Sequence, residues 1–313
     1  MLWERAREDG LRATALGSQH RPPARQVVGD LQTLLVARYP AGMEQGFYSV
    51  DGLRLRYLEW GKTRSDPIVL VHGFSSTADA WARVGEVLGA EYHVIAPDLR
   101  GHGESEWDPE ERYSDDQFAT DVHTLVQQLG LRPFTLIGHS MGGAVAFTYA
   151  ATYPQDVQRL VIEDSAPLPP GRMLTELRTT FASRTEVEQS VRAANPTMSE
   201  AAVRGRVDVY YRSRPDGTWG FRADVAGVRH GRGAHNADKS WDNVRKVTAP
   251  TLVIRAGAEP ALVSQETVER LGRENPRIHV VTVPGAGHNI HFAHFDQFMT
   301  HLRHVLSQPV AAA

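Results

Sequence analysis

Short apolar runs alternate with longer segments of helical periodicity from residue 67 to the C-terminal region. Such runs are typical of strands buried on both faces of a parallel sheet, and the longer segments are typical of the helices that connect them. The pattern predicts an α/β fold with a mostly parallel sheet flanked by helices. The expected strands read PIVLVHG from residue 67, YHVIAPD from 92, FTLIGHS from 134, VQRLVIED from 157, PTLVIRAG from 250 and IHVVTVPG from 278, and the expected helices lie near 78–89, 114–129, 141–153, 264–273 and 292–306.

Residues 165–240 interrupt this alternation. They are rich in Arg, Thr, Ser and Gly and contain no apolar run of the buried-strand type. We therefore predict an inserted, mainly helical cap between two segments of one α/β core, residues 46–164 and 241–313. Near the start of the core, Asp51 and Gly52 separate two short runs, which predicts a β-hairpin.

Residues 1–45 precede the alternation. The first 23 residues end in RPP and show little apolar periodicity, which is typical of a loosely docked arm. Val27, Leu31 and Leu34 then recur at helical spacing before Pro40, so we expect an amphipathic helix there. Residues 1–45 are thus interpreted as an N-terminal arm and helix.

The composition of the chain argues against several classes of function. The 34 basic residues are outnumbered by 37 acidic ones, and this net charge of −3 leaves no general basic field for nucleic acid. The chain has no cysteine, which excludes disulfides, thiolate metal sites and a cysteine nucleophile. The charged first residues do not resemble a signal peptide, and no run of eighteen apolar residues occurs. We expect a cytoplasmic protein with no membrane span, and its oligomeric state is left open.

A serine flanked by glycines lies where an expected strand passes directly into an expected helix. Residues 138–143 read GHSMGG, so Gly138, Ser140 and Gly142 form a G-x-S-x-G pattern. Glycines at these positions allow the close backbone approach that a sharp strand-to-helix turn requires. The helix N-terminus also favours developing negative charge. Ser140 is therefore the candidate nucleophile.

A serine hydroxyl needs a base to remove its proton, commonly a histidine that a carboxylate orients. Of the 14 histidines, His288 lies just after the last expected strand, at the same sheet edge as Ser140. His291 and His294 are spaced for the last helix, where packing is the simpler interpretation. The H-x-x-H spacings there have no acidic partner in sequence, so we predict neither a metal nor an organic cofactor.

Acyl transfer also requires hydrogen-bond donors for the oxyanion. The backbone N–H of Met141, directly after Ser140, is one candidate. The second is Phe74, since Gly73 allows the loop after the strand at 67 to turn back over the site. A plain tight turn at His72 and Gly73 is the alternative.

Four motifs follow one another along the chain: HGF at 72–74, DLRGHGES at 98–105, GHSMGG at 138–143 and GAGHNIH at 285–291. In this order they resemble the α/β-hydrolase superfamily, over roughly residues 46–308. The resemblance implies an eight-stranded, mostly parallel sheet with a cap inserted after the sixth strand. It also implies that Ser140 is the nucleophile, that His288 is the general base, and that Phe74 and Met141 donate to the oxyanion.

The DLRGHGES motif carries polar residues that look catalytic, Asp98, Arg100 and His102. Their counterparts in the family chiefly brace the loop after the fourth strand, so the resemblance implies a structural role for them.

The sequence departs from the family at the triad acid. The usual aspartate follows the seventh strand, and here Pro260 occupies that position. Glu259 is adjacent to it, whereas Asp164 follows the sixth strand, where some family members carry the acid. We favour Asp164 and retain Glu259 as the alternative. Glu163, one residue earlier, should point to the other side of its strand.

We expect a serine hydrolase that cleaves a carboxylic ester, thioester or lactone through an acyl-enzyme on Ser140. Its partner would be a small-molecule substrate with an apolar acyl group. Three alternatives stay open: a C–C bond hydrolase or an acyltransferase with the same triad, and a non-catalytic homologue that binds a small molecule.

Two groups of cap residues have two interpretations each. The aromatic residues could line an apolar substrate site or form the core of the cap, and the arginines could be solvated or could bind a substrate carboxylate. These residues are Tyr210, Tyr211, Trp219 and Phe221 for the aromatic group, and Arg204, Arg206, Arg212 and Arg214 for the basic group.

Overall fold

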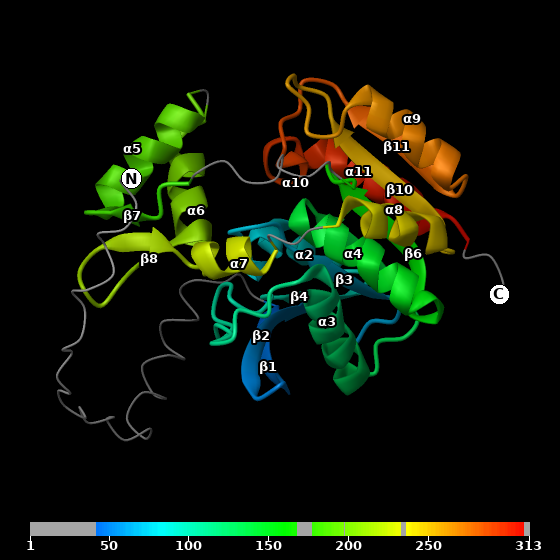
Figure 1. Cartoon of the computed structure of the whole chain (residues 1–313), viewed down its shortest axis with the longest axis horizontal. Helices are drawn as coiled ribbons and strands as arrows, with labels where there is room; N and C mark the ends of the chain where they lie inside the picture. Colours follow the sequence, from blue (N-terminus) through cyan, green and yellow to red (C-terminus); the bar gives the residue numbers. More distant parts are fainter. Residues whose placement is uncertain (1–41, 168–176, 197, 233–235, 310–313) are drawn as a thin grey trace, which may run out of the picture. The chain divides into compact units, whose positions relative to one another are not determined.

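An eight-stranded sheet lies at the centre of the computed structural model, which describes residues 42–167, 177–196, 198–232 and 236–309 (Figure 1). Of the expected N-terminal arm and helix, residues 1–45, the first 41 lie outside the described residues, and residues 43–45 belong instead to the first strand of the sheet. The sheet order is β1-β2-β4-β3-β5-β6-β10-β11, and all pairs are parallel except β1 with β2 and β2 with β4. This confirms the predicted fold class. The strands are β1 (Met43–Val50), β2 (Leu53–Trp60), β3 (Pro67–Val71), β4 (His93–Pro97), β5 (Phe134–His139), β6 (Val157–Glu163), β10 (Thr251–Ala256) and β11 (Ile278–Val283).

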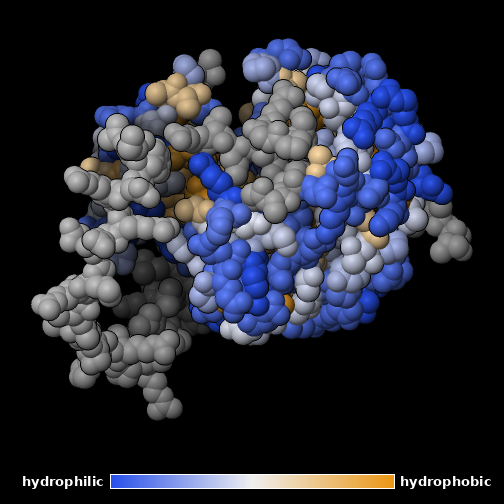
Figure 2. All heavy atoms as spheres, in the orientation of Figure 1, coloured by the Kyte–Doolittle hydropathy of each residue, from blue (hydrophilic) through white to orange (hydrophobic). Residues whose placement is uncertain are grey.

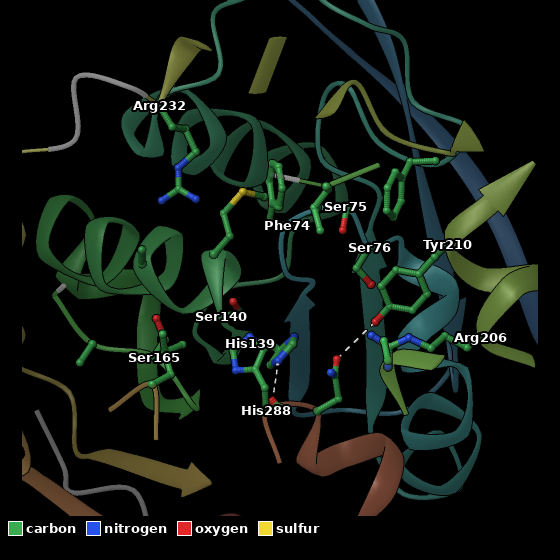
Figure 3. A pocket seen from close by; sticks show the side chains of 18 of the residues that line it. Phe74, Ser75, Ser76, His139, Ser140, Ser165, Arg206, Tyr210, Arg232 and His288 are labelled. Carbon is green, nitrogen blue, oxygen red and sulfur yellow. Dashed lines mark hydrogen bonds between the residues drawn. The ribbon is translucent and has the colours of Figure 1, made fainter. Parts of the chain in front are cut away.

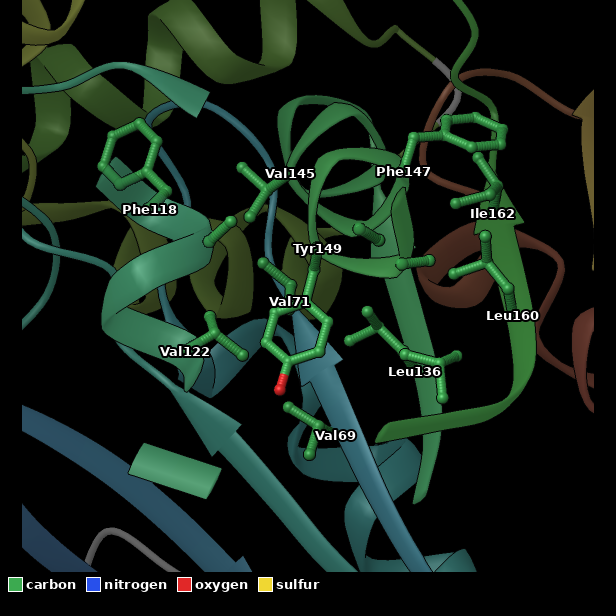
Figure 4. Close-up of a cluster of buried hydrophobic side chains, with 14 of the residues drawn as sticks. Val69, Val71, Phe118, Val122, Leu136, Val145, Phe147, Tyr149, Leu160 and Ile162 are labelled. Carbon is green, nitrogen blue, oxygen red and sulfur yellow. The ribbon is translucent and has the colours of Figure 1, made fainter. Parts of the chain in front are cut away.

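The apolar runs are continuous because both faces of the sheet are covered. Along β3, Val69 and Val71 pack into one hydrophobic cluster, and Ile68 and Leu70 pack into another on the opposite face. The first cluster includes side chains from α3, α4, α8 and α9, as Figure 4 shows for part of it, and the second includes side chains from α2 and α11. These helices are α2 (Ala82–Leu88), α3 (Asp115–Leu129), α4 (Met141–Thr152), α8 (Ala237–Lys246), α9 (Gln265–Glu274) and α11 (Phe295–Ser307).

The first two strands form the expected hairpin. Val50 pairs with Leu53, which leaves Asp51 and Gly52 as a two-residue loop. Both loop residues have positive φ, at 52° and 78°. The type I′ turn has this geometry, and its twist matches that of the flanking strands.

An insertion between β6 and β10 contains helices, as expected, and also a small sheet that the sequence did not reveal. Its three strands are antiparallel in the order β7-β9-β8, and each has only two or three residues. Residue 240, the expected end of the cap, lies within α8, a helix whose Asn243 hydrogen-bonds to Thr148 of α4. The insertion comprises β7 (Thr180–Phe181), α5 (Arg184–Ala194), α6 (Glu200–Tyr210), β8 (Tyr211–Ser213), β9 (Trp219–Phe221), α7 (Val225–Gly231) and the start of α8.

Buried charges hold the loop after β4. The Asp98 carboxylate accepts hydrogen bonds from the Arg56 guanidinium at 2.9 Å and from the Ala78 N–H at 2.7 Å. Arg100 contacts both carboxylate oxygens of Asp121 at 2.6 Å. All four side chains are buried, so these groups brace the loop.

The surface is mostly hydrophilic on the face shown in Figure 2, apart from small hydrophobic patches. Among the described residues, no helix has the length and apolar character needed to cross a bilayer.

Candidate active site

Ser140 lies on a sharp turn between β5 and α4, with φ 53° and ψ −116°. A non-glycine residue adopts such a conformation only when its surroundings enforce it. The glycines on either side explain how: a Cβ on Gly138 would lie 2.2 Å from the carbonyl oxygen of Gly142, and one on Gly142 would lie 2.3 Å from that of Val71. The G-x-S-x-G pattern therefore lets α4 begin directly against β3 and β5, which presents Ser140 at the sheet edge.

His288 and Asp164 meet at this edge. His288 Nδ1 donates a hydrogen bond to Asp164 Oδ2 at 2.7 Å. The other carboxylate oxygen of Asp164 accepts from the Ala256 N–H at 3.0 Å, and the Asp164 side chain is only 1% exposed. Asp164 has φ 42°, a left-handed conformation that aspartate tolerates better than most residues. The carboxylate is thus fixed on one side by the backbone of β10 and on the other by the imidazole.

Among the described residues, Glu259 forms no hydrogen bond or ion pair with His288. Its side chain is 75% exposed and lies 3.6 Å from Arg255, and its Oε2 accepts a hydrogen bond from the Ala261 N–H at 2.9 Å. Of the two carboxylates that the sequence left open, the structure brings Asp164 to the histidine.

The Ser140 hydroxyl and the His288 imidazole both line one cavity of about 680 Å³ (Figure 3). Within the described part of the chain, no hydrogen bond joins these two side chains. Catalytic hydrogen bonds are often long or poorly aligned without substrate, so this geometry is compatible with a serine–histidine pair.

The two residues predicted to donate to the oxyanion, Met141 and Phe74, belong to segments that contact or adjoin Ser140. Met141 is the first residue of α4, so no preceding helical turn accepts a hydrogen bond from its N–H. Phe74 follows Gly73, at which a Cβ would lie 2.9 Å from His139 Nδ1. Both Phe74 and Met141 line the cavity, as the predicted oxyanion donors should.

His139, next to Ser140, packs within the turn. Its Nε2 donates to the carbonyl oxygen of His288 at 3.0 Å. Burial lowers the pKa of His139 to about 3, so its imidazole is neutral at neutral pH. This contact ties the turn of Ser140 to the loop of His288.

A second buried acid–histidine pair lies behind the first one. Glu163 is the residue before Asp164 and accepts from His291 Nδ1 at 2.7 Å and from the His291 N–H at 2.9 Å. Burial raises the pKa of the Glu163 carboxyl, but the attraction of His291 and His139 and the hydrogen bonds from His291 outweigh it and hold that pKa at about 2. The pair anchors the short helix α10 (Ile290–Ala293) to β6, directly after His288.

This second pair was not predicted, because the spacing of His291 indicated only a packing residue or a metal ligand. Alternation along β6 was the available signal, since it placed Glu163 on the face opposite Asp164. Among the described residues, no cluster of three histidine or carboxylate side chains could hold a metal ion.

The cap aromatics divide between the two expected roles. Tyr210, Tyr211 and Phe221 line the cavity, and Trp219 packs against the buried cluster of α5 and α6 in the cap. The tyrosine ring of Tyr211 also stacks on Phe221, with ring centres 4.4 Å apart. The part of the cavity wall that the cap forms is therefore aromatic, and some of these aromatic side chains also pack against one another within the cap.

Comparison with known protein families identifies the family of this chain. Residues 66–295 match the model of the alpha/beta hydrolase fold family. The chain belongs to this family.

The proteins similar to this chain are named for different activities. N-formylmaleamate deformylase of Pseudomonas putida is 29% identical over 85% of this chain and 97% of its own. Lipase 1 of Psychrobacter immobilis is 40% identical over 37% of each chain. The crystal structure of an esterase from Mycobacterium tuberculosis, 23% identical, superposes with a TM-score of 0.74 and covers 93% of this chain and 100% of its own. The comparisons thus support a hydrolase and leave its substrate open.

Proposed function

We propose that this α/β-hydrolase is a serine hydrolase that cleaves a carboxylic ester, thioester or lactone through an acyl-enzyme on Ser140. The observation that carries the proposal is the 2.7 Å hydrogen bond from His288 to the buried Asp164 carboxylate, on the wall of the cavity that also contains Ser140. A buried carboxylate on Nδ1 leaves Nε2 as the basic nitrogen of the imidazole.

In this proposal, His288 Nε2 removes the Ser140 proton as the hydroxyl oxygen attacks the substrate carbonyl. The N–H groups of Met141 and Phe74 donate to the oxyanion, and the N-terminus of α4 stabilises it further. The imidazolium then protonates the leaving alcohol or thiol, and Asp164 stabilises the positive charge. Water activated by the same histidine releases the acid and restores Ser140.

The wall of the cavity favours an acyl group with apolar parts. Apolar side chains from the core and the cap contribute to it, and its volume of about 680 Å³ is in the usual range for small-molecule sites. The described wall residues that are apolar or aromatic are Phe74, Met141, Ala144, Phe147, Ala166, Pro167, Leu177, Phe181, Val191, Ala194, Tyr210, Tyr211, Phe221, Pro260, Ala261 and Leu262.

The test is hydrolysis of 4-nitrophenyl esters from acetate to decanoate by the wild type, Ser140→Ala and Ser190→Ala. Ser190 lines the same cavity from α5 in the cap, so its variant controls for loss of a hydroxyl from the wall. We expect Ser140→Ala to lose on the order of 10⁴- to 10⁶-fold in kcat and Ser190→Ala to change kcat by less than about threefold.

Wild-type turnover no faster than that of Ser140→Ala would refute an ester hydrolase. A C–C bond hydrolase or an acyltransferase would instead show Ser140-dependent chemistry with another substrate or acceptor. A non-catalytic homologue would bind a ligand in the cavity without turnover.

A further inference from the structure

The charge on the cavity wall is of one sign. The described residues that line the cavity include three arginines, Arg178, Arg206 and Arg232, but no aspartate, glutamate or lysine. Such a cavity favours an anion if at least one of these cations is uncompensated.

Carboxylates outside the cavity compensate two of the three arginines. Arg178 forms an ion pair with Glu186 at 2.6 Å. Arg232 forms one with Asp115 at 2.8 Å, and its side chain is only 5% exposed. Neither guanidinium therefore gives the cavity a net charge.

Arg206 differs from both. It lies on α6, is half-buried, and has its guanidinium carbon 5.0 Å from the centre of the Tyr210 ring. Within the described part of the chain, it forms no ion pair and no hydrogen bond. A contact with a ring face leaves the N–H groups at the edge of the guanidinium available to a ligand.

The position of Arg206 relates it to the candidate active site. Tyr210, on which Arg206 lies, donates a hydrogen bond from its hydroxyl to Asn289 Oδ1 at 3.4 Å, and Asn289 directly follows His288. Figure 3 shows the Arg206 side chain beside Tyr210 on the cap side of the pocket, whereas Ser140 and His288 come from the core. A substrate whose carbonyl lies at Ser140 can thus extend toward Arg206.

The other cap arginines do not share this position. Arg204 is exposed, and Arg212 lies over Trp107 in a separate surface depression. Arg214 donates to the backbone of Thr179. Of the four arginines that the sequence singled out, Arg206 alone is among the described residues of the cavity wall.

We propose that Arg206 binds a carboxylate of the substrate, so that the enzyme prefers esters that carry a carboxylate away from the scissile bond over neutral esters of the same length. The inference rests on the proposed function and names its substrate class. A guanidinium fork matches a carboxylate in two parallel hydrogen bonds, and the aromatic surroundings strengthen this attraction relative to water.

The test compares matched esters in wild type, Arg206→Gln, Arg206→Lys and Arg204→Gln. One pair places the carboxylate on the acyl group, mono-4-nitrophenyl adipate against 4-nitrophenyl hexanoate. The other places it on the alcohol, the hexanoyl ester of 4-hydroxybutyrate against butyl hexanoate. Arg204→Gln removes the same charge from the exposed side of the same helix and is the matched control.

We expect the wild type to favour the anionic ester in at least one pair. The ratio of kcat/KM for the anionic ester to that for the neutral ester should fall about 10- to 100-fold in Arg206→Gln, as for loss of a charge-assisted hydrogen bond. Arg206→Lys should retain part of the ratio, and Arg204→Gln should retain all of it. Equal ratios in Arg206→Gln and Arg204→Gln for both pairs would overturn the proposal.

Failure of the proposed function would give a different result: the wild type and Ser140→Ala would hydrolyse all four esters at the same rate. In that case, adipic acid monoamide, which carries one carboxylate, and the neutral hexanamide are titrated calorimetrically into Ser140→Ala and into Ser140→Ala combined with Arg206→Gln. At least tenfold tighter binding of the monoamide than of hexanamide, lost with Arg206→Gln, supports the carboxylate site. Equal affinities for the two amides, or no binding of the monoamide, overturn it.

Discussion

Replacing Asp164 with asparagine removes one charge at nearly constant shape. The amide oxygen of the Asp164→Asn side chain can still accept from the Ala256 N–H, as Asp164 Oδ1 does at 3.0 Å. The amide NH₂ group would then face His288 Nδ1, which in the wild type donates to Asp164 Oδ2 at 2.7 Å. The imidazole would have to accept at Nδ1 and carry its proton on Nε2, where it cannot act as a base toward Ser140.

The expected loss follows from this change of tautomer. An equivalent substitution in a serine protease triad lowers kcat by about 10⁴-fold, which corresponds to about 5 kcal/mol of transition-state stabilisation. We expect a similar loss here because Asp164 is buried and no other described carboxylate hydrogen-bonds to His288. The free energy of unfolding should change much less, since the shape and one hydrogen bond are retained.

The assay is kcat for one 4-nitrophenyl ester with wild type, Asp164→Asn and Glu259→Gln. Glu259→Gln is the matched control, because it makes the same chemical change at the carboxylate that the sequence left as the alternative. We expect its kcat to stay within about twofold of the wild type, as for an exposed side chain that does not itself line the cavity. A reversed result, with Asp164→Asn within tenfold of wild type and Glu259→Gln strongly impaired, would refute the assignment of the acid.

Two further predictions concern stability. Gly138→Ala should lower the free energy of unfolding by about 3 kcal/mol or more, because the new Cβ would lie 2.2 Å from a backbone oxygen. Gly205→Ala, in α6, has open space around it and should raise the free energy of unfolding by up to about 1 kcal/mol. Urea denaturation of both variants measures the two changes, and similar values for the two would contradict this prediction. Burial lowers the pKa of His72 to about 4 and those of His102 and His139 to about 3. As the pH falls below about 6.5, these histidines therefore become protonated in the unfolded chain before they do so in the folded protein, which favours unfolding. Each of the three should therefore cost up to about 2 kcal/mol of stability at pH 5, and an unfolding free energy equal at pH 7.5 and pH 5 would show that burial does not keep them neutral.

Much of the fold could be predicted because the sheet is buried on both faces. The run PIVLV of β3 has an apolar residue at every position, and this pattern differs clearly from that of the helices between the strands. The small cap sheet could not be predicted in this way, since strands of two or three residues show no period. The last helix also begins differently than expected: the chain forms α10, breaks at His294 and continues as α11.

Part of the candidate site also follows from the sequence. Parallel strands end at one edge, so residues after β5 and β11 were expected to meet, and the structure places Ser140 and His288 on one cavity. The choice between Asp164 and Glu259 depends on the left-handed backbone of Asp164 and on the N–H of Ala256, which are tertiary features. The position of the Arg206 guanidinium, which has no hydrogen bond or ion pair among the described residues, likewise depends on where α6 lies over the core.

The most direct experiment asks whether Ser140 is a nucleophile that His288 activates. Treatment with a fluorophosphonate, followed by peptide mass spectrometry, identifies such a serine by a stable covalent adduct. We expect one adduct, on the peptide that contains Ser140, with labelling absent in Ser140→Ala and strongly slowed in His288→Gln. Labelling at another serine, or none at Ser140 under conditions that modify a known serine hydrolase, would contradict it.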